Sequence, residues 1–546
     1  MAVRKETQQT GLMVNHSAYR NVSRALRALS AILAMVLTMA LLLLYVPTHT
    51  AFAEDGQQDT LTIDSSTAVM TDSSGYHVTA TVTNTTDHDL PEGTLTLALN
   101  AFYTFVSRND IQEWSEGTAR IPTPNTVGQV QVPALQPGAS ASVSIDADAT
   151  QQSLQAINTW GPKPVLLSYQ ADNTPIDEVH TFVTRSGTGL NTPSTPAMNI
   201  TVVQPLSSDG WTTDTNVLEQ LVDKGGLKSG TVAKIVTLGK DDAKPKELEQ
   251  VIAKHDGLQT IADPTYLQAM TMPTQVDGIM QPASFDITAY SAMDNAEGYS
   301  RAGVKRSSWN AKKAVSTYRS ALGDARAQAR IYAWQGTGNW TSKALTQAKQ
   351  QGYDTVIATH DFDESDAATV ETGKTVVSTD AGDVTVLSAQ NVLTDLAQGK
   401  ATSTQAEADG EGSSAGRLAR FAAQSAFYQM EQPYSDRNLL VCLSANGNPA
   451  DVDALMSVIE QSSWLNITDL NTLADATAAV PDTDGLSADR RTGIEQTLNT
   501  LTDTSNDVAR FNAFILTDDD KLNDNDAIVE WRKQLVRAQS TLALHA

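Results

Sequence analysis

A histidine among carboxylates is the clearest candidate for chemistry in the sequence. His360, Asp361 and Asp363 follow an apolar run at residues 356–359 that predicts a buried strand. Imidazole and carboxylate groups can ligate a metal ion or transfer protons near neutral pH. Neighbouring residues on an extended segment point to alternate sides, so only some of these groups could converge. A polar loop in an acidic protein is the alternative interpretation.

A second carboxylate, Asp263, follows another apolar run at residues 258–262. Paired with Asp361 or Asp363, it could cleave a glycosidic bond, because that reaction uses two carboxyl groups on either side of the scissile bond. The alternative is structural. An Asp-Pro dipeptide at the start of a helix places Asp263 at the N-cap and Pro264 in the first turn.

Three aromatic residues, Tyr332, Trp334 and Trp340, cluster around one predicted strand end. Their rings could form a platform that stacks on the apolar faces of sugar rings. Packing in the core or at its rim is the alternative. The sequence therefore offers a carbohydrate-binding surface as a hypothesis that does not require catalysis.

These candidate residues must be positioned by strands that alternate with helices. From residue 198 to residue 546, apolar runs of strand length alternate with helical patterns, which predicts a mostly parallel sheet covered by helices, either a β/α barrel or an open sheet. Segments 270–306 and 399–414 interrupt this pattern, and we expect them to be long surface loops. Residues 486–546 predict a closing helical layer.

The region before this α/β domain has a different period. Residues 57–186 contain short runs in which apolar and polar residues alternate, separated by turn residues, and such runs predict an all-β Ig-like sandwich. Residues 187–197 are rich in Ser, Thr, Pro and Gly and predict a linker. The expected fold is therefore multidomain, with a sandwich followed by an α/β barrel-like domain.

The first 53 residues predict export. A basic leader precedes an uncharged segment at residues 28–46, and the tripeptide at 51–53 fits the site that a signal peptidase cleaves. The uncharged segment is also nearly long enough to span a bilayer, so it could remain as a membrane anchor. Both alternatives place the rest of the chain outside the cytoplasm.

The composition of the chain argues against nucleic acid as a partner and against a cysteine nucleophile. The chain carries a formal net charge of −25, and no stripe of Lys and Arg is present to bind phosphates, so nucleic acid is not an expected partner. The one cysteine, Cys442, lies in an apolar run without a nearby histidine. We therefore expect a buried structural thiol rather than a nucleophile.

Three segments carry a resemblance to a known family: residues 258–264, 331–334 and 464–473. Together with the order of leader, Ig-like module and α/β region, they resemble an uncharacterised family of actinobacterial secreted envelope proteins, often encoded near the lipid II flippase. The resemblance implies a cell-envelope role and a second domain similar to glycoside hydrolase and polysaccharide deacetylase barrels. Relatives commonly continue into another β-domain and a C-terminal transmembrane helix, whereas this sequence ends at Ala546.

Deacetylases of that barrel type carry a strand-end Asp-Asp pair and a His-x-x-x-His metal motif, and the sequence contains neither. In the α/β region outside the terminal tail, the histidines are His255 and His360, which are too few for that ligand set. We therefore expect no metal-dependent deacetylation and no cofactor. The first hypothesis is a binding or scaffolding protein for cell-wall glycan or envelope proteins. The alternative is a glycan-active hydrolase that uses Asp263 with Asp361 or Asp363.

Overall fold

The computed structural model describes most of the chain after the leader. The described residues are 60–191, 195–214, 216, 236–238, 245–270, 273–362, 369–404, 408–480, 486, 494–514 and 544. The predicted leader at residues 1–53 lies outside them. Within these ranges, no helix combines the length and the apolar character needed to cross a membrane.

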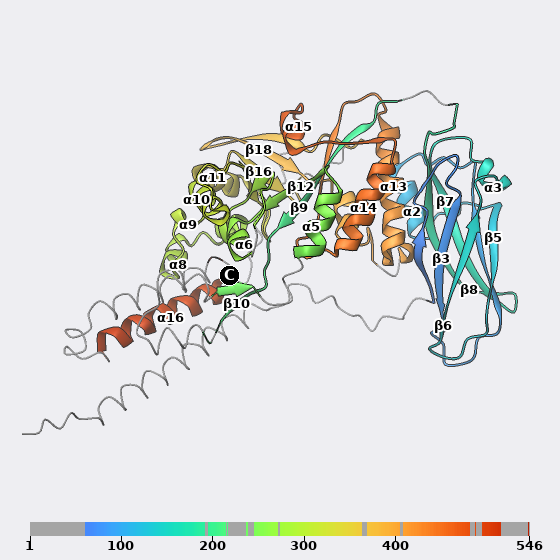
Figure 1. Ribbon diagram of the computed structural model, residues 1–546, viewed down its shortest axis with the longest axis horizontal. Coiled ribbons are helices and arrows are strands. Elements are labelled where there is room, and N and C mark those ends of the chain that lie inside the picture. Colours follow the sequence, from blue (N-terminus) through green and yellow to red (C-terminus); the bar gives the residue numbers. More distant parts are fainter. Residues whose placement is uncertain are drawn as a thin grey trace, which may run out of the picture.

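The first part of the described chain forms two β-sheets that share one hydrophobic core (Figure 1). The three-stranded sheet contains β1 (Leu61–Ser66), β3 (Tyr76–Thr83) and β6 (Ser140–Ala147). The five-stranded sheet contains β2 (Val69–Met70), β8 (Thr174–Arg185), β7 (Gly161–Ala171), β4 (Gly93–Leu99) and β5 (Asn125–Val132). Buried and more exposed residues alternate along β3 and β4, because successive side chains point to opposite faces. The Ig-like topology stays a prediction.

The second part contains mainly parallel strands in two further sheets. The larger has the order β14 (Arg330–Ile331), β13 (Gly278–Ile279), β12 (Leu258–Ala262), β9 (Met198–Leu206) and β19 (Asn438–Cys442), and β20 (Leu465–Ile467) also pairs with β9. The smaller has the order β15 (Ala333–Trp334), β16 (Thr355–Ala358), β18 (Gly382–Ser388) and β17 (Lys374–Thr379), with β17 antiparallel. The strand pairings define two sheets rather than one closed ring, so the barrel stays a prediction.

Helices pack against these strands. They are α5 (Pro245–Lys254), α6 (Pro264–Ala269), α9 (Arg306–Trp309), α10 (Ala311–Leu322), α11 (Ser342–Gln350), α12 (Asn391–Ala397), α13 (Ser414–Glu431), α14 (Pro449–Gln461) and α15 (Leu470–Asp475). The last long element, α16 (Ile494–Phe514), packs against α8 (Ala296–Arg301), as expected for part of a closing helical layer. Most of the predicted layer beyond residue 514 lies outside the described residues.

The single cysteine confirms the expectation of a structural thiol. Cys442 is free and buried in a cluster with Val203, Leu387 and Leu440, which come from three neighbouring strands. Burial raises the pKa of its thiol well above the usual range. Because only the thiolate reacts readily, we expect Cys442 to resist alkylation by iodoacetamide in the native chain and to react after denaturation. Rapid labelling of the native chain would contradict this burial.

The expectation of a long surface loop at residues 270–306 is wrong for most of that segment. It contains β13, the 3-10 helix η2 (Pro282–Ser284), α7 (Ile287–Met293) and α8. Asp286 and Asn295 cap the two α-helices, and Phe285 stacks on Trp309 with ring centroids 4.9 Å apart. Helices of six or seven residues show too little apolar periodicity to be recognised in a sequence.

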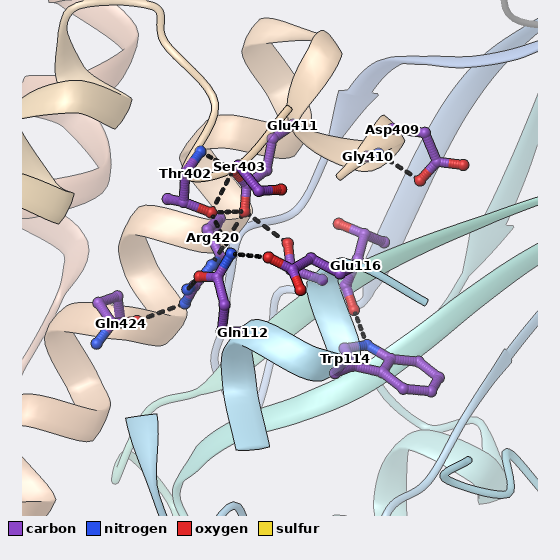
Figure 2. A network of polar contacts seen from close by, with 12 residues as sticks. Gln112, Trp114, Glu116, Thr402, Ser403, Asp409, Gly410, Glu411, Arg420 and Gln424 are labelled. Carbon is purple, nitrogen blue, oxygen red and sulfur yellow. Dashed lines mark hydrogen bonds and ion pairs between the residues drawn. The ribbon is translucent and has the colours of Figure 1, made fainter. Parts of the chain in front are cut away.

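The expected loop at residues 399–414 instead lies at the junction between the two parts of the molecule. Its 3-10 helix η3 (Asp409–Gly412) leads into α13, which packs against β1, β7 and β8 (Figure 1). Glu411 Oε1 lies 3.1 Å from Arg420 Nε, and both side chains are buried. Gln112, from α2 (Arg108–Ser115), accepts a hydrogen bond from Arg420 (Figure 2). The hydroxyl of Ser115, at the end of the same helix, donates to Glu411 Oε1. Buried polar contacts thus join the two-sheet region to the α/β region.

Candidate functional site

Polar side chains follow the carboxyl ends of four neighbouring strands. Asp263 follows β12, Gln281 follows β13, Gln335 follows β15, and His360 with Asp361 follows β16. We call these five residues the strand-end cluster. In parallel α/β proteins the carboxyl ends of the strands are where catalytic side chains usually lie. The hydrogen bonds of these side chains therefore decide which chemistry is available here.

Asp263 is the N-cap of α6, which confirms the structural interpretation of the Asp-Pro dipeptide. Its Oδ1 accepts hydrogen bonds from Thr265 N at 2.7 Å and from Ala283 N at 2.9 Å. Ser284 Oγ donates to its Oδ2 at 3.4 Å. The residue has no exposed surface, and this burial raises its pKa to about 7 although the hydrogen bonds oppose the shift.

The turn that Asp263 contacts adopts an unusual backbone conformation. Ala283 has a φ of 61° and Ser284 a φ of 47°, both in the left-handed region that non-glycine residues rarely adopt. Two consecutive residues of this kind are unfavourable unless their surroundings hold them. Asp263 holds this turn through the amide of Ala283 and the hydroxyl of Ser284. Its carboxylate therefore has a structural task at both the helix and the turn.

The two glutamines of the cluster connect adjacent strands. Gln281 accepts from Trp334 N and donates to Trp334 O, each at 2.9 Å, and it also donates to Phe285 O. Gln335 Oε1 accepts from Thr359 N at 2.6 Å and from His360 N at 3.2 Å. Both side chains are buried. Through these amides Gln281 joins the segment after β13 to β15, and Gln335 joins the end of β15 to the segment after β16.

His360 is held by its neighbours through both ring nitrogens. Nε2 lies 3.2 Å from Gly336 O, which can only accept, and Nδ1 lies 3.3 Å from Gln335 Nε2, which can only donate. These partners give Nε2 the donor role and Nδ1 the acceptor role. Asp361 Oδ2 lies farther away, 3.7 Å from Nδ1, and its backbone has a φ of 47°.

The structure does not bring the proposed carboxylate pair into one open site. Asp263 is buried in the cap of α6, whereas the side chain of Asp361 is about one-third exposed on the turn after β16. Asp363 lies outside the described residues. A glycosidase pair must reach both sides of a bound sugar, and Asp263 has no surface with which to do so. The catalytic role of Asp361 and Asp363 stays a prediction.

The three aromatic candidates do not form one exposed platform. Tyr332 and Trp340 are 2% and 1% exposed and belong to two different hydrophobic clusters. Trp340 Nε1 donates to Ile357 O at 3.0 Å, which fixes the indole inside the fold. Trp334 keeps partial exposure. Burial of two of the three rings leaves no surface for a sugar to stack across the set.

His255, the other histidine of the α/β region, connects two helices instead of forming a site. Its Nδ1 lies 2.7 Å from Glu460 Oε1 and its Nε2 lies 2.9 Å from Asp453 Oδ1. No local sequence pattern indicates this contact, because the partners lie about two hundred positions away on α14. Among the described residues, no group of three or more His, Cys, Asp or Glu side chains is placed to hold a metal ion.

A family model for a family of unknown function, DUF6049, matches residues 24–546. The chain belongs to this family. The match agrees with the predicted membership of an uncharacterised family over nearly the whole sequence, whereas the actinobacterial origin and the envelope role stay predictions. No curated protein matches the sequence.

Solved structures show only weak similarity. A β-glucosidase from Listeria innocua matches with 18% identity and a TM-score of 0.17, over 24% of this chain and 16% of the glucosidase. A protein described as a polysaccharide deacetylase, from Mycobacterium smegmatis, matches with 7% identity and a TM-score of 0.29, over 52% of this chain and 93% of that protein. These scores are too low to carry an argument about fold or activity.

Three of the five residues in the strand-end cluster of this DUF6049 member therefore have structural roles. Asp263 caps a helix, and Gln281 and Gln335 connect strands. Sequence reasoning missed both glutamines, because an amide does not titrate and is rarely considered as a site residue. A signal was present, since each glutamine directly follows a short apolar run that ends a strand.

Proposed function

We propose that this chain is a non-catalytic binding or scaffolding protein of the cell envelope. The observation that carries the proposal is the use of the strand-end side chains. A catalytic acid, base or nucleophile must reach the substrate, yet Asp263, Gln281 and Gln335 are buried and bonded to the protein's own backbone. His360 also uses both ring nitrogens internally.

The proposed architecture for this role is a barrel-like domain without an active site, preceded by an Ig-like sandwich. Two links between the parallel sheets support the barrel. Only Tyr332 separates β14 from β15, and a bridge joins Ala389, just after β18, to Leu440 of β19. One apolar cluster also contains residues from or beside seven parallel strands: Val203, Ile261, Met280, Tyr332, Ile357, Leu387 and Leu440. Such a cluster is what the interior of a small barrel contains.

The buried junction supports a scaffolding role. A single surface salt bridge contributes little to stability, whereas breaking a buried pair is costly. Glu411 and Arg420 form such a buried pair, and side chains of α2 complete their hydrogen bonds (Figure 2). The two parts are therefore expected to move together, as a rigid spacer between two partners would need.

The proposed location is extracytoplasmic, on the basis of the leader sequence. Residues 28–46 hold the chain at the membrane if the bond after Ala53 is not cleaved. The proposed partners are cell-wall glycan or envelope proteins, and the strong negative charge supports the exclusion of nucleic acid.

Co-sedimentation of the full chain with isolated cell walls tests this proposal. We expect the chain to sediment with the walls, and the double variant His360→Gln/Asp361→Asn to sediment to the same extent, because the strand-end cluster serves the fold. A chain that remains in the supernatant, and that captures no envelope protein on cross-linking in cells, would contradict the binding role. Loss of binding in the double variant alone would show that the cluster is a ligand site.

A further inference from the structure

A polar cavity of about 150 Å³ lies at one end of the two-sheet region. Its walls come from the end of β2, the end of β8, α3 (Gln152–Gln155) and the turn at residues 187–190. Arg185, the last residue of β8, lines it and is only 5% exposed. The cavity is far in sequence from the strand-end cluster and is not part of the proposed function.

Arg185 makes hydrogen bonds through fewer of its nitrogens than the other two buried arginines of the described chain, of which Arg437 leaves only Nε without a partner. Arg420 has Glu411 as its counterion, Arg437 donates to three backbone carbonyls, and Lys163 donates to two oxygens. Arg185 uses only Nη1, which donates to Ser186 O at 2.7 Å and weakly to the Ser186 hydroxyl. Among the described residues, its Nε and Nη2 have no hydrogen-bond acceptor, and burial lowers its pKa. A buried cation with unused donors is costly unless something in the cavity pairs with it.

One carboxylate, Asp72, faces the same cavity. It forms no ion pair with Arg185, but its charge is near enough to oppose the lowering of the Arg185 pKa. The turn at Gly189 lies directly against it, since a Cβ on Gly189 would lie 2.7 Å from the Cβ of Asp72. The cavity therefore presents a cation and an anion that do not neutralise each other by contact.

We propose that this cavity binds a small zwitterionic α-amino acid. The ligand carboxylate pairs with Arg185, whose planar guanidinium suits a carboxylate. The ligand ammonium group faces Asp72. A side chain of a few atoms packs on the buried apolar wall formed by Met70, Leu154 and Ile157.

The opposite charges of Arg185 and Asp72 favour a zwitterion over a simple anion. A phosphate or acetate ion gains from Arg185 but is repelled by Asp72 and by the net charge of −25. A zwitterion carries no net charge and offers each wall its opposite partner.

Isothermal titration calorimetry of the full chain tests the proposal, with alanine and glycine as probes and with acetate as the comparison ligand. We expect alanine to bind and acetate to bind at least about tenfold more weakly, which corresponds to about 1.4 kcal/mol. Absence of heat with both alanine and glycine would overturn the proposal, and the cavity would then hold water only.

Two variants assign the roles. Arg185→Met keeps a long apolar stem and should lower the affinity for alanine at least about tenfold, whereas Arg330→Gln, at an exposed arginine on β14, should leave it unchanged. Asp72→Asn, at the exposed rim, should weaken alanine binding while acetate binding stays equal or improves. If Arg185→Met fails to fold, the alanine affinity of Asp72→Asn tests the proposal. Equal alanine affinity in Asp72→Asn and the parent would contradict recognition of a zwitterion.

Discussion

Replacing Glu411 with alanine is expected to lower the free energy of unfolding by about 3–5 kcal/mol, because the change leaves Arg420 charged and unpaired in a buried position. The carboxylate accepts from Arg420 Nε at 3.1 Å, from the Ser115 hydroxyl at 2.5 Å and from Thr402 N at 2.6 Å. These donors come from three segments of the chain. Urea denaturation followed by circular dichroism measures the loss.

The matched control removes both charges. The double variant Glu411→Ala/Arg420→Met should be more stable than Glu411→Ala alone, since no unpaired charge remains. Limited proteolysis near residues 399–414 should also become faster in the single variant. A single variant as stable as the parent would show that the junction does not depend on this pair, and the rigid connection between the two parts would lose its support.

The second large effect is expected at Asp263. Asp263→Ala removes the cap of α6 and leaves the buried amide of Ala283 with a weaker set of acceptors, at a cost of about 2–4 kcal/mol. Asp263→Asn keeps an acceptor oxygen for Thr265 N and Ala283 N, so most of the stability should remain. Thermal unfolding of the parent and both variants at one pH measures the difference. Equal destabilisation by alanine and asparagine would contradict the capping role.

The pH dependence of folding stability shows whether burial or hydrogen bonding has the larger effect on the pKa of Asp263. Its pKa is raised to about 7 in the folded chain, above the ordinary value of an aspartate, so the folded state binds the proton more tightly. The associated stability is present at low pH and is lost as the pH rises from about 4 through about 7, by as much as about 4 kcal/mol. The stability of Asp263→Asn relative to the parent should therefore increase as the pH rises across this range. If the parent instead becomes more stable relative to the variant as the pH rises, the carboxylate of Asp263 is ionised in the folded chain and stabilised by its hydrogen-bond donors.

Several elements could be predicted because their signals are local. The strand predicted at residues 258–262 is β12 (Leu258–Ala262), since an apolar run ends at an Asp-Pro dipeptide. The buried Cys442 follows in the same way from its apolar neighbours. The cap at Asp263 was one of two interpretations, and the position of Pro264 in the first turn favoured the one that the structure has.

The features that could not be predicted depend on distant contacts. Trp340 and Tyr332 have the composition of a sugar-binding platform, and only the packing of several strands shows that both are buried. Glu411 lies in a segment whose small and acidic residues predict a surface loop. In the structure this residue is buried by its contacts with Ser115 and Arg420. The pattern of a single sequence indicates how apolar residues recur along a segment, but it does not show which distant residues that segment contacts in the fold.

We propose that the strand-end cluster performs no catalysis, and release of products from cell-wall glycan is the measurement that tests this proposal most directly. The full chain is incubated with purified glycan across a range of pH, and new reducing ends are counted beside His360→Gln and Asp361→Asn. We expect the parent and both variants to release no more reducing ends than a sample without protein. Release by the parent that either variant abolishes would contradict the claim and restore the hydrolase hypothesis.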